Sequence, residues 1–149
     1  MDCEQIGPPA PRPCASCPYR RDVPSGVWHT DEYEKLPRYD AETGEQPRVL
    51  FLCHQNDGDD KHRRMCAGWA GCHDGDELLA VRLAVLAGNI SPETAQAVVD
   101  YQSPVPLFDS GAEAAEHGVR DINTPDSEAL RTMEKIRRVR SDIIETEPA

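Results

Sequence analysis

Four cysteines are the residues of this chain whose type and spacing could do chemistry. They follow the pattern C-x2-C-x35-C-x12-C and are Cys14, Cys17, Cys53 and Cys66. Two thiolates separated by two residues can face one ion, and two more complete the four ligands of a zinc ion or an iron–sulfur cluster. The pattern therefore predicts one inorganic centre held by these four side chains.

Zinc and a [4Fe–4S] cluster both accept four thiolates, so the type of ligand does not separate them. One close pair plus two isolated cysteines, with Pro18 directly after Cys17, favours a [4Fe–4S] cluster. One zinc ion is the alternative. A redox pair, or two small buried apolar side chains, is the remaining interpretation of the CxxC segment.

Three neighbouring residues could replace one of the four cysteines as ligands, because thiolate and neutral imidazole both bind zinc. They are Cys72, His54 and His73. We expect His54 to hydrogen-bond a sulfur or a carbonyl instead, and Cys72 to pack on a helix as the spare thiol. An acidic loop over residues 54–62 could hold a catalytic divalent ion, although a solvated loop is the commoner explanation.

Aromatic and basic residues close to the cysteines are predicted to surround the centre. Trp28 and Trp69 would exclude water from it, with ordinary core packing as the equal alternative. Arg20 would offset the negative charge of four thiolates, or would simply be solvated. No catalytic residue is predicted.

Several runs of the sequence resemble an uncharacterised domain-of-unknown-function family of actinobacteria and their phages. These runs are CASCPYRRDVPSGVW, FLCHQ, CAGWAGC and PLFDSGAEAAEHG. The resemblance covers about residues 14–120. It implies that Cys14, Cys17, Cys53 and Cys66 are the family's four cysteines, and it implies no activity.

A second, partial resemblance is to the WhiB-like iron–sulfur regulators. In that family a CxxCP-x-R run precedes a Gly-Val-Trp turn, much as Cys17-Pro18-Tyr19-Arg20 precedes Gly26-Val27-Trp28 here. The resemblance implies a small thiolate-ligated centre, an aromatic turn and a basic C-terminal segment.

The composition bounds the class of protein and its partners. The chain has 149 residues with 16 basic and 27 acidic side chains, and the resulting charge of −11 disfavours binding to nucleic acid. Aromatic residues make up only 5%, so a metal would supply stability that a thin core lacks. Neither a membrane span nor a secretory signal is apparent, and we expect a cytoplasmic protein.

The expected fold is a mainly α domain with an irregular cysteine-rich N-terminal half and one short strand. Residues 14–143 would form this domain, after a disordered or extended proline-rich lead-in at 1–13 and before a frayed tail at 144–149. The apolar run at 48–53 predicts the strand. Helices are predicted at 30–36, along an apolar stripe that ends at Gly88, from Ser91, over 110–117 with Gly118 closing it, and from about 124 to 143.

The last predicted helix carries basic residues that could contact nucleic acid or an acidic partner, although a solvated helix face is the commoner explanation. They are Arg131, Lys135, Arg137, Arg138 and Arg140. The leading hypothesis is a non-catalytic metal-binding protein that acts as a regulatory or interaction module and binds another macromolecule, most plausibly a protein. The alternatives are a redox or metal-dependent enzyme, and a purely structural zinc-stabilised domain.

Overall fold

The structure is a computed structural model that describes residues 6–53 and 63–139 of the 149-residue chain. The predicted tail at 144–149 lies outside these residues. Within them the chain forms six α-helices and three short 3₁₀ helices. In chain order they are α1 (Thr30–Lys35), η1 (Leu36–Asp40), η2 (Thr43–Glu45), α2 (Ala67–Cys72), η3 (Gly75–Glu77), α3 (Leu79–Ala87), α4 (Pro92–Asp100), α5 (Gly111–Arg120) and α6 (Ser127–Val139).

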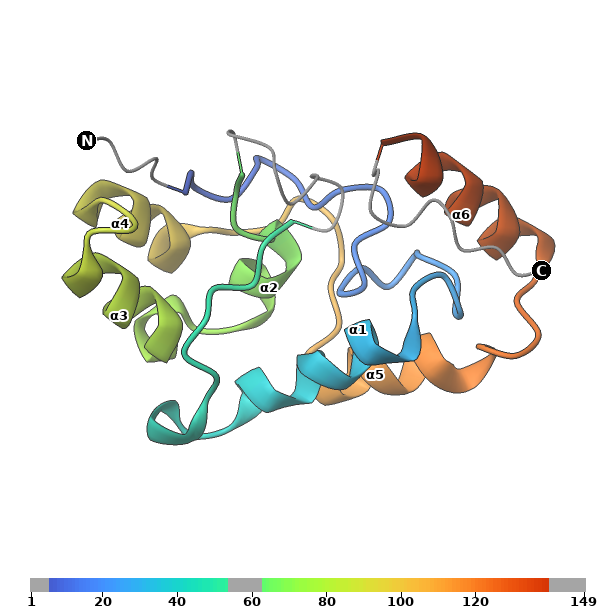
Figure 1. The fold of residues 1–149 in the computed structure, drawn as a ribbon, viewed down its shortest axis with the longest axis horizontal. Helices are drawn as coiled ribbons and strands as arrows, with labels where there is room; N and C mark the ends of the chain where they lie inside the picture. The colour runs from blue at the N-terminus through green and yellow to red at the C-terminus, as the bar shows by residue number, and fades with distance from the viewer. Residues whose placement is uncertain (1–5, 54–62, 140–149) are drawn as a thin grey trace.

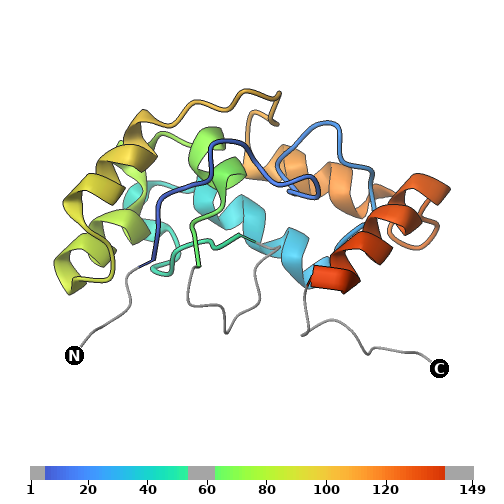
Figure 2. The ribbon, with the colours of Figure 1, turned by 90° about the horizontal axis from the view of Figure 1, so that it is seen from above.

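The helices are spread along an elongated molecule with α2 near its middle (Figure 1). Helices α3 and α4 lie side by side at one end and α6 lies at the other, an arrangement that the view from above also shows (Figure 2). The predicted mainly helical fold is confirmed. The longest described helix, α6, has 13 residues, and none of the described helices is long and apolar enough to cross a lipid bilayer.

Local sequence signals set several helix ends where they were predicted. The Ser91 hydroxyl accepts a hydrogen bond from the Thr94 amide at 3.0 Å and caps α4, and Ser110 caps α5 in the same way. Helix α3 ends at Gly88, whose φ of 82° is the left-handed conformation that glycine adopts at little cost. These caps position the helical half without help from a sheet.

The strand predicted at 48–53 is reduced to an extended segment with one isolated antiparallel bridge, between Leu52 and Met65. Next to the bridge, the Cys66 amide donates to the Phe51 carbonyl at 2.8 Å. A lone strand needs further strands beside it to form a sheet, and none of the described segments supplies them. The bridge instead fastens this segment to the start of α2.

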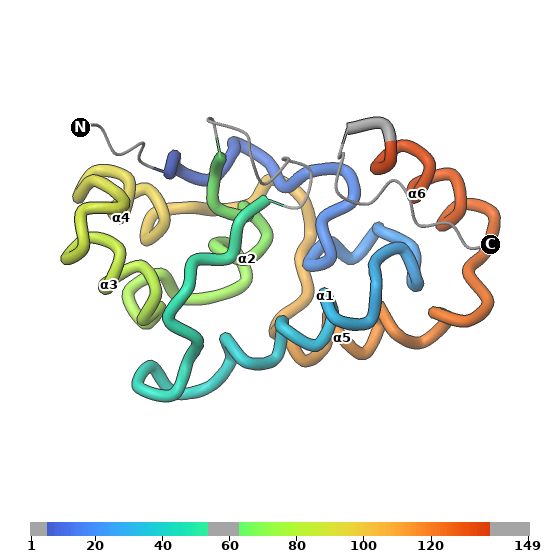
Figure 3. Tube along the Cα trace, in the orientation of Figure 1, coloured from blue at the N-terminus to red at the C-terminus, as the bar shows by residue number. Residues whose placement is uncertain are grey.

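Residues 6–13, predicted as a disordered or extended lead-in, are extended and attached to the rest of the molecule. The Ile6 amide donates to the Asn89 carbonyl at 3.1 Å, and Gly7 forms a parallel bridge with Arg64. Proline blocks helix but leaves an extended chain free to pair at its non-proline positions. Figure 3 traces this segment beside the chain that leads into α2.

An aromatic cluster forms the centre of the core. The rings of Tyr19, Tyr39 and Phe51 meet edge to face, with centroids 5.7 and 5.8 Å apart, and Trp69 lies against Tyr39 at 5.4 Å. All four side chains are buried. Edge-to-face contacts of this kind stabilise a core beyond the area they bury, which matters in a chain with few aromatic residues.

Gly118 lies inside α5 and does not close it, contrary to the sequence prediction. A Cβ atom at this position would overlap the ring of Tyr33, which comes from α1 and is 2% exposed. The glycine therefore lets α5 and α1 pack closely, a tertiary requirement that a helix-end signal in the sequence does not distinguish from a cap.

We expect Gly118→Ala to destabilise the protein by about 1–3 kcal/mol, because the buried Tyr33 ring cannot move away from the added methyl group. This loss outweighs the gain of about 1 kcal/mol that alanine has over glycine in a helix. Urea unfolding followed by far-UV circular dichroism measures it. Gly44→Ala is the control, since a Cβ there meets nothing within 4 Å; equal stability of the two variants would contradict the close packing.

Candidate metal centre

The N-terminal pair of cysteines lies on a turn that is held by backbone hydrogen bonds and by the side chain of Trp28. The Cys17 amide donates to the Cys14 carbonyl at 3.0 Å, and the Arg20 amide donates to the Cys17 carbonyl at 3.0 Å. The indole N–H of Trp28 donates to the Ser16 carbonyl inside the turn at 2.8 Å. Two successive turns therefore hold Cys14 and Cys17 at the surface of the aromatic core.

The two later cysteines are brought together by the crossing of their segments. Cys53 follows the extended segment, and its amide donates to the Arg64 carbonyl at 2.9 Å. Cys66 is the N-cap residue of α2 and bonds to Phe51 across the same crossing. Cys53 and Cys66, which have 12 residues between them in the sequence, thus lie at the same crossing of the backbone.

The four predicted cysteines meet as two close pairs. The sulfurs of Cys17 and Cys66 are 3.7 Å apart, and the thiols of Cys14 and Cys53 are hydrogen-bonded to each other. The pairs also act on each other electrostatically, since the charge of Cys17 raises the pKa of Cys14 and the charge of Cys14 raises the pKa of Cys66. A Cβ atom at Gly68 would overlap the Cys17 sulfur, so glycine makes the room that this pairing needs.

In residues 6–53 and 63–139, no three His, Cys, Asp or Glu side chains already have the arrangement that holds a metal ion. The four sulfurs are paired two by two, as hydrogen-bonded thiols are. A cation binds thiolates and attracts all of them toward one point, so its ligands must lose their protons and change partners.

Burial makes the thiolate form costly at this site. The pKa of Cys66 is raised well above its ordinary value, by burial first and by the hydrogen bond with Cys17 second. The pKa of Cys14 is raised by its hydrogen bond with Cys53 and then by burial. The Trp69 amide donates to the Cys66 sulfur at 3.4 Å and opposes this effect. A bound cation would reverse the balance, because it favours the charged sulfurs.

The predicted surrounding residues lie next to the turn or the core. Trp28 is 6% exposed over the CxxC turn, and Trp69 is fully buried in the aromatic cluster. The Arg20 guanidinium donates to the Pro13 carbonyl at 3.1 Å and pairs with Asp22 at 2.7 Å. Its positive charge also interacts with Cys14 and Cys17.

The proposed substitute ligand Cys72 has a hydrogen-bond partner outside the group of four cysteines. Its thiol donates to the Phe108 carbonyl at 3.4 Å. Burial, and then the charge of Asp40, raises the pKa of Cys72 to about 12. This thiol lines a cleft of about 420 Å³, but a reactive nucleophile needs a lowered pKa.

His54 and the rest of the acidic loop at 54–62 lie outside the described residues.

His73 has both ring nitrogens engaged elsewhere. Nδ1 faces the Trp69 carbonyl at 2.9 Å, and Nε2 faces the Asp40 carboxylate at 3.1 Å. The same carboxylate accepts hydrogen bonds from the amides of Gly111 and Ala112 at 2.8 Å, at the start of α5. His73 therefore joins α2 to α5, and this arrangement leaves it no free nitrogen for a metal.

Two polar groups beside the centre are buried without a hydrogen-bond partner among the described residues. They are the Tyr19 hydroxyl and the indole N–H of Trp69. A buried polar group left unpaired costs about 1–3 kcal/mol. Sequence reasoning assigned no role to Tyr19, or to Gly68 beside the Cys17 sulfur; their positions two residues after Cys17 and after Cys66 were the only signal.

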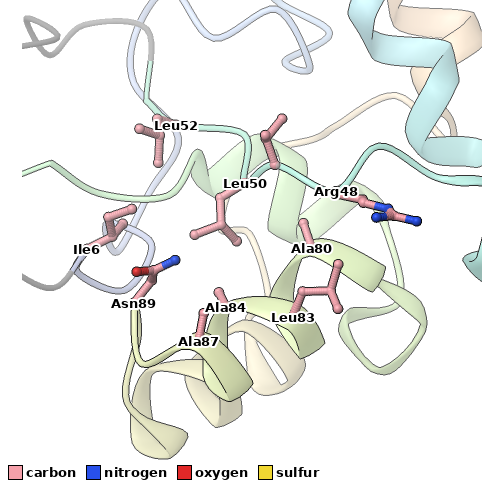
Figure 4. A pocket seen from close by; sticks show the side chains of 10 residues that line it. Ile6, Arg48, Leu50, Leu52, Ala80, Leu83, Ala84, Ala87 and Asn89 are labelled. Atoms are coloured by element: carbon pink, nitrogen blue, oxygen red, sulfur yellow. The ribbon is translucent and has the colours of Figure 1, made fainter.

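An apolar groove of about 330 Å³ lies between the extended segment and α3 (Figure 4). Its apolar lining includes Leu50, Leu52, Leu83, Ala84 and Ala87. Arg48 at one end is the only charged residue in the lining, whereas the chain as a whole carries 27 acidic residues.

The predicted basic surface on α6 is mixed in charge. Arg131, Lys135 and Arg137 are exposed, and Arg137 pairs with Glu134 at 3.7 Å. Arg140 and the side chain of Arg138 lie outside the described part of the chain. Acidic residues between the basic ones weaken the field that nucleic acid would need.

A family model described as a family of unknown function, DUF6283, matches residues 9–140. The chain belongs to DUF6283. The prediction that it belongs to an uncharacterised family is thereby confirmed. A search of curated proteins found no match, and a search of solved structures found none either. The DUF6283 match spans all four clustered cysteines and every described helix, so the family covers the whole candidate centre.

We expect Cys72 in the native protein to react slowly with iodoacetamide at pH 8. With a pKa of about 12, only about one thiol in 10,000 is ionised at that pH. Labelling measured by peptide mass spectrometry should be at least about 100-fold slower in the native protein than in urea. Because folding raises the pKa of Cys72 from 9.0, the neutral buried thiol contributes fully to the free energy of unfolding below about pH 9. This contribution is lost as the pH rises toward 12. Equal labelling in both states would contradict this assignment.

Proposed function

We propose that this DUF6283 protein is a non-catalytic metal-binding protein in which Cys14, Cys17, Cys53 and Cys66 hold one structural zinc ion. The observation that supports the proposal most is the 3.7 Å separation of the Cys17 and Cys66 sulfurs, next to a second hydrogen-bonded cysteine pair. The resulting module would bind another macromolecule.

The sulfur–sulfur distance favours zinc over the cluster. Zinc–sulfur bonds of about 2.3 Å in a tetrahedron place two thiolates about 3.8 Å apart, close to the 3.7 Å between Cys17 and Cys66. In a [4Fe–4S] cluster each thiolate binds a different iron atom, so the cysteine sulfurs are farther apart. The [4Fe–4S] cluster favoured by the sequence therefore becomes the alternative here.

A metal at this site would tie together three parts of the chain. These are the CxxC turn, the extended segment that ends at Cys53, and the start of α2 at Cys66. In a small protein with a thin core, the free energy of metal binding stabilises the folded state, because the unfolded chain has no such site. Four protein ligands also fill the coordination of zinc, which leaves no open position for a substrate.

We expect protein purified without added metal to be colourless and to contain about one zinc per chain. Cys66→Ser should lose the zinc and unfold at lower temperature, because three thiolates leave the ion incompletely coordinated. The matched control, Cys72→Ser, should keep both metal and stability. Metal analysis and an absorbance spectrum decide the matter: a brown protein with about four irons supports the alternative cluster, and metal retained by Cys66→Ser contradicts the ligand set.

The partner proposed for the module is a protein segment that carries apolar and acidic side chains. The groove between the extended segment and α3 offers it an apolar floor, and Arg48 offers it a positive charge. Val49 in the lining of the groove is 68% exposed, and Leu86 on α3 is 83% exposed, so apolar side chains of both elements face solvent. The charge of the rest of the molecule would repel such a segment, so complementarity is confined to this face.

Selection of random displayed peptides on the metal-loaded protein tests this surface. We expect the selected peptides to be rich in aliphatic and acidic residues, and Leu83→Asp or Arg48→Glu to weaken their binding at least about 10-fold. Leu130→Asp is the control, since Leu130 is 55% exposed on α6, at the far end of the molecule. If the selected peptides were basic, or bound all variants equally, the groove would be excluded as the peptide-binding surface.

A further inference from the structure

The two sides of the extended segment differ in their backbone hydrogen bonds. On one side, the Phe51 carbonyl accepts a hydrogen bond from the Cys66 amide at 2.8 Å. The Cys53 amide donates to the Arg64 carbonyl at 2.9 Å on the same side. Leu52 lies between these two bonds and forms the isolated bridge, so the bridge is the non-hydrogen-bonded type of antiparallel pair.

The opposite edge carries the polar backbone groups of Leu50 and Leu52. Alternate residues of an extended chain direct their N–H and C=O groups to opposite sides, so these two leucines face away from the chain that leads into α2. Within the part of the chain that the structure describes, nothing hydrogen-bonds to the backbone of either leucine. Two N–H donors and two C=O acceptors are therefore free, at the two-residue repeat of a strand, about 6.8 Å.

This free edge borders the apolar groove. The side chains of Leu50 and Leu52 line the groove on one side, and Leu83 and Ala84 line it from α3 (Figure 4). A strand placed along the edge would pair with the two leucines, and every second one of its side chains would point into the groove. Backbone pairing and apolar contact are thus available to the same ligand.

An extended ligand satisfies this edge and a helical one does not. A helix bonds its own backbone groups internally, so a helix in the groove would cover the leucine amides and carbonyls and leave them without partners. An added strand supplies those partners. Strand addition obtains its affinity from main-chain hydrogen bonds and its specificity from the side chains that enter the groove.

The groove is polar at its two ends, where Arg48 and Asn89 lie (Figure 4). An acidic side chain beside Arg48 would be paired there and a basic one would be repelled. The side-chain amide of Asn89 can bond to a peptide group. A second copy of this chain fits the edge less well, because two molecules that each carry a charge of −11 repel each other.

We propose that the edge at Leu50 and Leu52 binds one extended segment of a partner protein by strand addition. The bound segment places apolar side chains in the groove at every second position and an acidic side chain next to Arg48. The inference rests on the partner surface put forward under the proposed function, and it adds the conformation and the hydrogen bonds of the bound segment.

Amide hydrogen exchange followed by NMR tests the added strand on the full-length protein. The probe is a synthetic copy of the tightest-binding peptide selected on this protein. At saturation we expect exchange at the Leu50 and Leu52 amides to slow at least about 10-fold, because each amide becomes hydrogen-bonded to the peptide. The Phe51 amide is the internal control: it lies on the other side of the segment and should change little.

Methylation of the peptide backbone gives a second test that needs no protein variant. An added strand pairs through the N–H groups of every second residue. N-methylation of those residues should weaken binding at least about 10-fold, whereas N-methylation of the residues between them should leave binding nearly unchanged.

Three outcomes would overturn the added strand, each in a different way. Bound peptide without protection of Leu50 and Leu52, or binding that tolerates every N-methyl group, would do so while the groove stands as the partner surface. Protection that appears without peptide and rises with protein concentration would assign the edge to a second copy of the chain. If no peptide binds the protein, the proposed partner surface fails together with the strand.

Discussion

The pairing of Cys17 with Cys66 and of Cys14 with Cys53 is the interaction that joins distant parts of this chain. Cys14 and Cys17 come from a proline-rich N-terminal turn, whereas Cys53 and Cys66 come from either side of an extended crossing. The extended segment forms no sheet in the described residues, so packing, isolated bridges and single backbone hydrogen bonds hold these parts together. A cation bound by all four sulfurs would add a direct link between these parts, and its positive charge would offset the cost of burying the thiolates of Cys66 and Cys14.

The surrounding structure is arranged as a support for this junction. Trp28 bonds the backbone of the CxxC turn, and Gly68 leaves room for a sulfur. On the other side of the aromatic cluster, His73 and Asp40 join α2 to the start of α5. The candidate centre therefore lies where the irregular half of the chain meets its helical half, and the apolar groove is lined by the same extended segment together with α3.

The sequence predicted the features that depend on local chemistry. Ser91 and Gly88 mark helix ends because capping is decided within a few residues. Features that depend on distant partners were not predictable: Gly118 meets Tyr33 across two helices, and residues 6–13 pair with chain that lies far along the sequence. The same distinction applies to the site, where cysteine spacing pointed to four ligands, but the pairing of their sulfurs and the unpaired Tyr19 hydroxyl emerged only from the fold.

X-ray absorption spectroscopy of the purified protein tests the four-thiolate zinc centre most directly. A zinc edge with four sulfur neighbours at about 2.3 Å, and no nitrogen or oxygen neighbour, is the predicted result. An iron edge with iron–iron scattering would show a cluster in place of zinc. Zinc surrounded by nitrogen and oxygen would show that the cysteines do not converge on the metal, which would contradict the account.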